Sequence, residues 1–256
     1  MAVPSARERI VSIDYCADQM VLGLVERKRI AAVSVDVASD PAFSLPLARG
    51  LPRVRAEIER VLALRPTLVV RSYGGGPRFA AAMERAGVPV FTLPYAATLG
   101  DVDDVMAAAG ERLNARAMAS RRRGELAQAL GNARETAGST GTALYVTPGD
   151  VSTGPGSMIA EMVGVAGYRS YEGKAGWHRL PVERLIAEPP DLVVRGFFET
   201  SAHRQDRWTS SSHGVLREAV ADVPTVDVPG SELSCGNWLI GEAVGSVAAA
   251  RLRPPS

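Results

Sequence analysis

The sequence predicts two Rossmann-like α/β lobes with parallel sheets, joined by one long inter-lobe helix. A helix–proline–strand segment occurs twice, at 58–71 and 182–195, and the copies agree at eight of fourteen positions without a gap. Between them, residues 98–137 contain no proline and repeat apolar residues at helical spacing. Apolar strand candidates alternate with helix candidates on both sides, which is typical of parallel sheets covered on both faces. A repeated unit on each side of a long helix therefore indicates two similar lobes.

The stretch between the two copies is expected to join the lobes. Thr98 and Asp101 have the spacing of a helix N-cap with an acidic third residue. Asn114 is expected to cap a second run of about 22 residues, ~33 Å long. A helix of that length can act as a rigid strut, whereas the alternative is a surface helix on one domain. We expect an N-terminal lobe at 1–97, a bridging helix at 98–138 and a C-terminal lobe at 139–256.

The other elements follow in order along the chain. Asp18 is expected to cap a helix through Val25, and three prolines make 38–53 an irregular loop. In the first half, strands are expected at 10–13, 29–35 and 89–93 and a helix at 77–86. The first repeat copy is expected to supply a helix that ends at 64 and a strand that ends at 70. The second half is expected to hold strands at 142–147, in the second repeat copy and at 224–228, helices at 158–165 and from 238 to about 251, and a loop at 167–178.

Composition and charge exclude several classes of function. The chain has 256 residues, of which 46% are hydrophobic, so each half can bury a core. Its formal net charge of +1 provides no overall attraction to nucleic acid or to an anionic membrane. No apolar run approaches the roughly 18 residues of a membrane span. The first residues lack the apolar region of a secretion signal, and we expect such a signal to have been removed.

Candidate binding residues are found by their position after strands. In open α/β sheets, ligands bind beyond the carboxyl ends of the strands. This rule collects Tyr15, Cys16, Asp36, Ser72, Tyr73, Pro94, Tyr95, Pro148, Trp177, Arg195, Phe197, Phe198, Cys235 and Trp238. If the lobes face each other, these side chains line a cleft whose aromatic walls suit a large, flat, partly apolar ligand. We expect about half of the aromatic residues only to cap loops or cover the core.

Catalysis has weak support in the sequence. Residues Gly74 to Gly76 lie between a strand and a helix, where backbone amides can hold an anion. They lack the lysine of a P-loop and the spacing of a dinucleotide motif. Ser157 does not lie in a nucleophile elbow, and Asp103 and Asp104 are on the exposed side of a helix. We therefore expect no enzyme activity and no cofactor.

A metal site built by the protein alone is not expected either. His178, His203 and His213 all lie in loops of one half, without the spacing of a ligand pair. Cys16 and Cys235 each follow a strand, one in each lobe. Three alternatives are open for them: a disulfide that pins the lobes together, soft donors to the metal of a ligand, or two unpaired thiols.

Five stretches, in order along nearly the whole chain, resemble the substrate-binding proteins of bacterial ABC importers for cobalamin, ferric siderophores and haem. The family's opening strand and helix are matched by RIVSIDYCADQMVLGL, and its E-x-φ-x-x-L-x-P-D-L-V segment by IERVLALRPTLVV and again by the second repeat copy. Its entry to the bridging helix is matched by AGVPVFTLPYAATLGDV, and the start of its second lobe by STGPGSMIAEMVGVAG. Thr67 stands where the segment usually has aspartate, whereas Asp191 keeps it.

The resemblance implies a periplasmic or lipid-anchored protein that captures a metal chelate and delivers it to an ABC permease. In cobalamin binders of this family, a tryptophan ahead of the second-lobe repeat packs on the ligand, and Trp177 in GWHRLPVERL matches it. Docking to the permease uses a carboxylate on each lobe, and Glu183 matches the second-lobe position. The first-lobe position falls near Arg78, so Glu59 is expected to substitute, with Glu57 and Glu84 as alternatives.

We therefore expect a monomeric, bilobal binding protein and not an enzyme. Its ligand is expected to be a cobalamin-like corrinoid or a ferric siderophore, less so haem, whose axial ligand has no clear match although Tyr15, Tyr73 and Tyr95 are available. Arg71 or Arg195 would receive anionic groups of the ligand, unless both make structural ion pairs. The alternative is an α/β enzyme that acts on a tetrapyrrole or a nucleotide in the same cleft.

Overall fold

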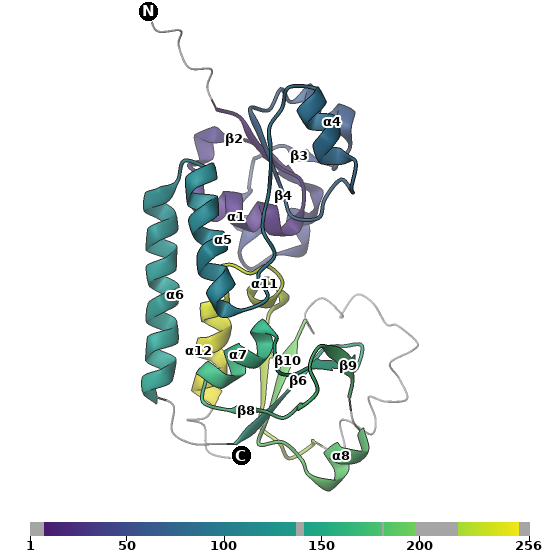
Figure 1. Cartoon of the computed structure of the whole chain (residues 1–256), viewed down its shortest axis with the longest axis vertical. Coiled ribbons are helices and arrows are strands. Elements are labelled where there is room, and N and C mark those ends of the chain that lie inside the picture. Colours follow the sequence, from purple (N-terminus) through teal and green to yellow (C-terminus); the bar gives the residue numbers. More distant parts are fainter. Residues whose placement is uncertain (1–7, 137–140, 181, 198–219, 251–256) are drawn as a thin grey trace, which may run out of the picture. The chain divides into compact units, whose positions relative to one another are not determined.

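The computed structural model describes residues 8–136, 141–180, 182–197 and 220–250. The chain forms two compact units, one of Met1–Tyr95 with Asp103–Arg121 and the other of Ala96–Val102 with Arg122–Ser256. Each unit contains its own parallel sheet with helices packed on it (Figure 1). Two α/β lobes with parallel sheets are therefore confirmed.

The first unit is built on a five-stranded sheet in the order β3-β2-β1-β4-β5, in which every pairing is parallel. Its strands are β1 (Ile10–Ser12), β2 (Ile30–Ser34), β3 (Arg53–Val54), β4 (Leu68–Arg71) and β5 (Val90–Thr92). Its helices are α1 (Tyr15–Leu24), α2 (Ser44–Leu47), α3 (Ile58–Ala63) and α4 (Phe79–Arg85), with 3-10 turns η1 (Arg27–Arg29) and η2 (Val35–Ser39). Val11 and Val69 of the central strands pack with Val61, Phe79 and Met83 in its core.

The second unit combines a parallel sheet with a short antiparallel pair. The sheet has the order β11-β10-β6-β8, from β6 (Thr142–Val146), β8 (Arg169–Ser170), β10 (Leu192–Gly196) and β11 (Thr225–Val228). The antiparallel pair joins β7 (Val151–Thr153) to β9 (Trp177–Arg179). Its helices are α7 (Met158–Val165), α8 (Val182–Ala187), α11 (Gly230–Leu233) and α12 (Ile240–Ala250). Leu144, Val193 and Leu185 contribute to the core.

Two helices, α5 (Leu99–Arg112) and α6 (Arg116–Thr136), form the stretch between the repeat copies. Thr98 and Asp101 make the predicted capping box, in which Asp101 N donates to Thr98 Oγ1 at 3.1 Å and Thr98 N donates to Asp101 Oδ2 at 2.9 Å. The second helix has 21 residues, as the apolar spacing predicts. The boundaries between the two units fall within both helices.

The sequence repeat is a structural repeat. Helices α3 and α8 begin and end at matching positions, and the strands that follow them, β4 and β10, are each flanked by two parallel neighbours. The same backbone bond recurs, since Val69 N donates to Pro89 O at 3.0 Å and Val193 N donates to Pro224 O at 2.9 Å. The prolines accept without donating, which suits the first residue before an edge strand.

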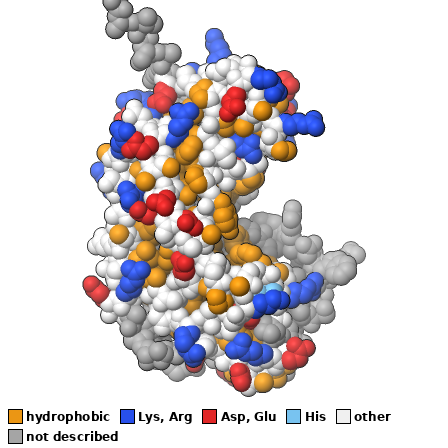
Figure 2. Space-filling model, viewed as in Figure 1, with side chains coloured by type: hydrophobic (Ala, Val, Ile, Leu, Met, Phe, Trp, Pro, Cys, Tyr) orange, Lys and Arg blue, Asp and Glu red, His pale blue; other side chains and the backbone are white. Residues whose placement is uncertain are grey.

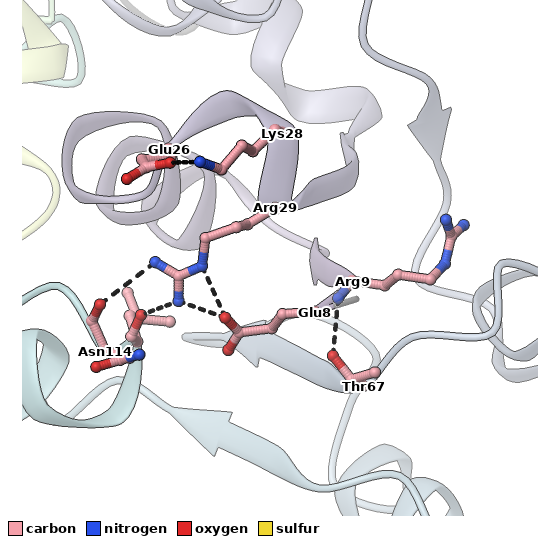
Figure 3. A network of polar contacts seen from close by, with 8 residues as sticks. Glu8, Arg9, Glu26, Lys28, Arg29, Thr67 and Asn114 are labelled. Atoms are coloured by element: carbon pink, nitrogen blue, oxygen red, sulfur yellow. Dashed lines mark hydrogen bonds and ion pairs between the residues drawn. The ribbon is translucent and has the colours of Figure 1, made fainter. Parts of the chain in front are cut away.

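Thr67 performs in the first copy the contact that aspartate makes in the second. Asp191 Oδ2 accepts from Thr142 N at 2.6 Å, which ties the start of β10 to the start of β6. Thr67 Oγ1 accepts from Arg9 N at 2.8 Å, at the equivalent place beside β1 (Figure 3). A hydroxyl can accept the same backbone donor as a carboxylate. The departure from the family segment therefore preserves its hydrogen bond.

Four local expectations were wrong. Asp14, not Asp18, caps α1, and Asp18 lies inside the first turn. Asn114, with φ of 48°, ends α5 instead of capping α6, because Asn114 N bonds to Glu111 O and Ala115 N to Gly110 O in a left-handed C-terminal turn. The loop expected at 38–53 contains the end of η2, all of α2 and the first residue of β3. The loop expected at 167–178 contains β8 and most of β9, so Trp177 lies on a strand.

Candidate functional site

Asp14 organises the carboxyl edge of the first sheet. It follows β1, is fully buried, and accepts from Ala17 N at 2.9 Å through Oδ1, which caps α1. Its Oδ2 accepts from the backbone N–H groups of Ser72, Tyr73 and Gly74 at 2.6, 3.1 and 2.8 Å. Bonds from several amides to one carboxylate are charge-assisted and strong. Asp14 therefore fixes the loop after β4 against the start of α1.

The loop after β4 comes so close to β1 that it needs glycine. A Cβ at Gly74 would lie 2.7 Å from the carbonyl oxygen of Ile13. Gly75 has φ of 77°, where side chains are strained. Arg71, at the end of β4, is buried and donates from Nη1 to Gly76 O at 2.8 Å. Its guanidinium thus supports the loop from inside through a backbone carbonyl oxygen, which is a structural role but not the ion pair named as the alternative for this arginine.

Two exposed tyrosines extend from this edge. Tyr73 is 58% exposed and Tyr95, which follows β5, is 86% exposed, whereas Tyr15 is half-buried at the start of α1. Partial burial and then the negative charges of Asp14 and Asp36 raise the pKa of Tyr73. Its phenol is therefore neutral at physiological pH. Neutral exposed rings can pack on a flat, partly apolar ligand.

A second buried carboxylate, Asp18, lies one turn into α1. It accepts from Ser34 N at 2.9 Å and from Ser34 Oγ at 2.6 Å, and also from the hydroxyl of Ser12. Burial raises the pKa of Asp18 to about 6, although these hydrogen bonds act in the opposite direction. Asp18 therefore links α1 to β1 and β2 and titrates close to neutral pH.

In the second unit, Trp177 presents an exposed ring beside a buried tyrosine. Trp177 is 58% exposed on β9, opposite Thr153 of β7. Its ring meets that of Tyr145 edge to face, with centroids 6.1 Å apart and planes at 68°. Tyr145 lies in β6 and is buried. The central sheet thus supports one edge of the indole and leaves its remaining surface open, as a stacking residue requires.

Arg195 and Phe197 lie at the end of β10. Arg195 donates from Nε and Nη2 to the two carboxylate oxygens of Asp227 on β11, each at 2.7 Å. This bidentate pair is again the structural alternative, because the charge of Arg195 is balanced within the sheet. Phe197 is half-buried and has φ of 68°, which turns the chain sharply after the strand. Phe198 lies outside the described residues.

Trp238 has a different environment from Trp177. It is only 6% exposed, and the guanidinium of Arg122 on α6 lies 5.1 Å from its ring centroid. Such a cation–π contact anchors the segment before α12 to α6. Trp238 therefore covers the core, as was expected for about half of the aromatic residues.

The cysteines are not free thiols. Cys16 and Cys235 are both disulfide-bonded, and the described residues contain no free cysteine. Neither side chain therefore has a thiol to donate to the metal of a ligand. His178 is bonded on both ring nitrogens, to Gly176 and Glu172, while His203 and His213 lie outside the described residues. No group of three acidic, histidine or cysteine side chains in the described ranges is placed to hold a metal ion.

The expected docking carboxylates lie on matching helices. Glu59 is exposed on α3 and Glu183 is exposed on α8, at equivalent positions of the repeat. Glu57, the first alternative, forms an ion pair with Arg60.

Acidic and basic side chains are interspersed over the visible surface of both units (Figure 2). Among the described helices, none is long and apolar enough to cross a membrane.

Several residues of these edges escape sequence reasoning. The sequence does not single out Asp14, because the loop amides that it binds lie about sixty positions away. Glu172 was not considered, although it is buried and bonded to His178. Three-residue strands such as β7 and β9 are too short for a period of two to be visible. The one local signal was the Asp14–Ala17 spacing, which is also that of an N-cap.

A family model described as periplasmic binding protein matches residues 10–207 of this chain. No curated protein matches the sequence. Because the model spans most of the chain, from β1 to beyond β10, it includes both units and both copies of the repeat.

Solved structures with the same fold agree with this match. The periplasmic heme-binding protein HutB of Vibrio cholerae is 16% identical, with 97% of this chain and 100% of that chain covered and a TM-score of 0.76. The periplasmic vitamin B12 binding protein BtuF of Vibrio cholerae is 19% identical, with 95% and 96% covered and a TM-score of 0.64. An ABC-type Fe3+-hydroxamate transport system protein from Saccharomonospora viridis is 15% identical, with 95% and 93% covered and a TM-score of 0.69. The chain belongs to the periplasmic binding protein family, whose members bind solutes and are not enzymes.

Proposed function

We propose that this protein is the substrate-binding component of an ABC importer and that it captures a metal chelate in the periplasm for delivery to the permease. The observation that carries the proposal is the presence of exposed aromatic rings on both units of a periplasmic binding protein: Tyr73 and Tyr95 follow strands of the first unit, and Trp177 lies on β9 of the second. Exposed aromatic residues at the carboxyl ends of parallel strands favour a large, flat, partly apolar ligand.

The charges at these edges support a chelate held mainly by aromatic contact. Arg195 is neutralised by Asp227, and Arg71 is occupied by the carbonyl oxygen of Gly76. A cobalamin-like corrinoid or a ferric siderophore of low charge suits such an edge. Haem remains the weaker alternative, since its two carboxylates would need cations. The neighbour HutB is a heme-binding protein, whereas the neighbour BtuF binds vitamin B12. Metal would arrive as part of the ligand and not as a resident ion.

Delivery to the permease is proposed to use Glu59 and Glu183. They occupy equivalent positions on the matched helices α3 and α8, and both are exposed without an ion-pair partner among the described side chains. Exposed carboxylates on two units can engage two basic sites of a partner and set its orientation. We further propose a monomer that is either free in the periplasm or lipid-anchored, and no nucleic-acid partner because the net charge is only +1.

Equilibrium titration tests the role of the aromatic rings. Cyanocobalamin, a ferric hydroxamate and haemin are added separately while tryptophan fluorescence is followed. Stacking contacts contribute about 1 kcal/mol or more, so Trp177→Ala is expected to weaken binding of the chelate by about tenfold. Leu47→Ala, which removes another exposed apolar side chain, is the matched control and should bind normally. Equal affinity in the wild type and in Trp177→Ala would contradict the proposed site.

A further inference from the structure

A buried glutamate–histidine pair supports the strand that carries Trp177. Glu172 is 5% exposed, and its Oε2 lies 2.9 Å from His178 Nε2. The other ring nitrogen of His178, Nδ1, lies 2.9 Å from the carbonyl oxygen of Gly176. His178 directly follows Trp177 in β9 and lies opposite Ser152 of β7. The pair therefore fixes β9 at the residue next to the exposed indole.

Counting donors shows that the two contacts of His178 together require an additional proton. A carbonyl oxygen only accepts, so Nδ1 must carry a proton to bond with Gly176. Nε2 and Glu172 then form a hydrogen bond only if a second proton lies between them, either on the ring or on the carboxyl group. Without that proton, two lone pairs face each other inside the protein, where an unmade hydrogen bond is costly. Both contacts of His178 can therefore persist together only in the protonated pair.

Among the described residues, no neighbouring group donates a hydrogen bond to the carboxyl group of Glu172 in place of the shared proton. Glu172 Oε1 is buried and has no hydrogen-bond partner among the described residues. Arg184 on α8 is directed at Tyr171, donating to its carbonyl oxygen at 2.9 Å and lying 4.2 Å from its ring centroid. Among the described residues, the neighbouring elements also carry these titratable or charged groups: Tyr145 of β6, Asp150 before β7, Arg169 of β8, Lys174 in the loop, Arg179 of β9, Glu183 of α8 and Glu188 after α8.

Tight packing connects the pair to the indole. A Cβ at Gly154, which follows β7, would lie 2.4 Å from the carbonyl oxygen of Lys174 and 2.7 Å from that of Glu172. The backbone around Glu172 is therefore in contact with the end of the strand that pairs with Trp177. Since β7 and β9 are only three residues long, few ladder hydrogen bonds hold β9 beside the ring.

We propose that Glu172 and His178 are positioning residues for Trp177 and that they make the presentation of the indole depend on pH. The protonated pair holds β9 in the arrangement described here. Deprotonation breaks one of the two contacts of His178 and loosens the ring. The consequence for ligand capture rests on the function proposed above: binding of a chelate on Trp177 is stronger at acidic pH than at alkaline pH.

The first test needs no ligand. The indole N–H resonance of Trp177, assigned by its loss in Trp177→Phe, is followed by NMR from about pH 5 to about pH 9. It is expected to shift in the wild type and to stay constant in Glu172→Gln, because a glutamine amide donates to neutral Nε2 and keeps both contacts without the shared proton. Arg179→Gln is the matched control, since it removes an adjacent exposed charge and should shift like the wild type. A constant resonance in the wild type, or the same shift in Glu172→Gln, would overturn the proposal.

The second test adds cyanocobalamin at about pH 6 and about pH 9. Binding to the wild type is expected to be about tenfold weaker at the higher pH, the size of effect that one lost hydrogen bond produces. Glu172→Gln should bind equally at both values, and His178→Phe should bind weakly at both. Wild-type affinity that does not change with pH overturns the link to ligand capture. Failure of the protein to bind any chelate counts against the proposed function, and the ligand-free NMR result then decides this inference alone.

Discussion

Single residues in this protein carry much of the organisation at the edges of the sheets. Asp18 is an example, because it is fully buried and yet accepts hydrogen bonds from Ser12 and Ser34 on two neighbouring strands. Those bonds favour the charged carboxylate, whereas burial disfavours it more strongly and raises the pKa of Asp18 to about 6. The balance makes Asp18 a group whose charge changes close to physiological pH.

The raised pKa of Asp18 predicts a pH-dependent contribution to stability. In the unfolded chain the carboxyl group ionises near its ordinary pKa of 3.8, so the folded state binds the additional proton between that value and about pH 6. The favourable contribution is fully present below the lower value and is lost as the pH rises through the upper one. Since each pKa unit corresponds to about 1.4 kcal/mol, the loss of unfolding free energy is about 3 kcal/mol. Urea unfolding at several pH values should show this loss in the wild type relative to Asp18→Asn.

An exposed carboxylate provides the control for that comparison. Asp104→Asn, on the surface of α5, should follow the wild type at every pH. If the wild type and Asp18→Asn differ by the same free energy of unfolding at about pH 4 and about pH 7, the raised pKa is contradicted.

At the scale of elements, loops are tied to helices by carboxylates at the helix starts. Asp14 accepts one bond that caps α1 and three from the loop after β4. Ser157, by comparison, caps α7 through a single bond to Ala160 N. Removal of Asp14 leaves more backbone N–H groups unpaired than removal of Ser157. The loss of unfolding free energy should therefore be larger for Asp14.

Replacing the two caps by alanine measures that difference. Ser157→Ala should cost about 1 kcal/mol of unfolding free energy, the usual loss of one N-cap. Asp14→Ala should cost about 3 kcal/mol or more, because three further N–H groups, two part-buried and that of Gly74 buried, also lose their acceptor. It should also weaken chelate binding by displacing Tyr73. Equal losses in the two variants would show that Asp14 is only an N-cap.

How well the sequence predicts an element depends on where its partners lie. The repeat predicted α3, β4, α8 and β10 well because each element carries its own periodicity and proline boundary. The local sequence does not decide whether Asp14 or Asp18 caps α1, since both precede apolar residues at helical spacing. The pair β7–β9 is defined by cross-strand bonding and not by pattern. Glu172 and Trp238 acquire their roles from distant partners, His178 across a loop and Arg122 on α6.

At the scale of the whole molecule, both cysteines of the chain are disulfide-bonded. Thiol titration in denaturant should detect no reactive thiol before reduction and two after it, because the chain has two cysteines and both are disulfide-bonded. Two reactive thiols before reduction would contradict the disulfide.

The docking proposal separates binding from transport. Glu59→Lys and Glu183→Lys together should leave chelate affinity unchanged and abolish uptake by the permease in proteoliposomes, because like charges at two sites oppose docking. Asp104→Lys, a charge reversal at an exposed position of α5 that is not a docking candidate, is the control and should support uptake. Normal uptake with the double variant would remove both residues from the docking surface.

The central claim is that this periplasmic binding protein captures a metal chelate. A thermal-shift panel of cyanocobalamin, ferric siderophores, haemin and nucleotides tests it most directly, since ligand at ~100 times Kd adds about 2.7 kcal/mol to stability. We predict that at least one chelate raises the melting temperature and that nucleotides do not. Stabilisation by a nucleotide alone, with no response to any chelate, would contradict the account.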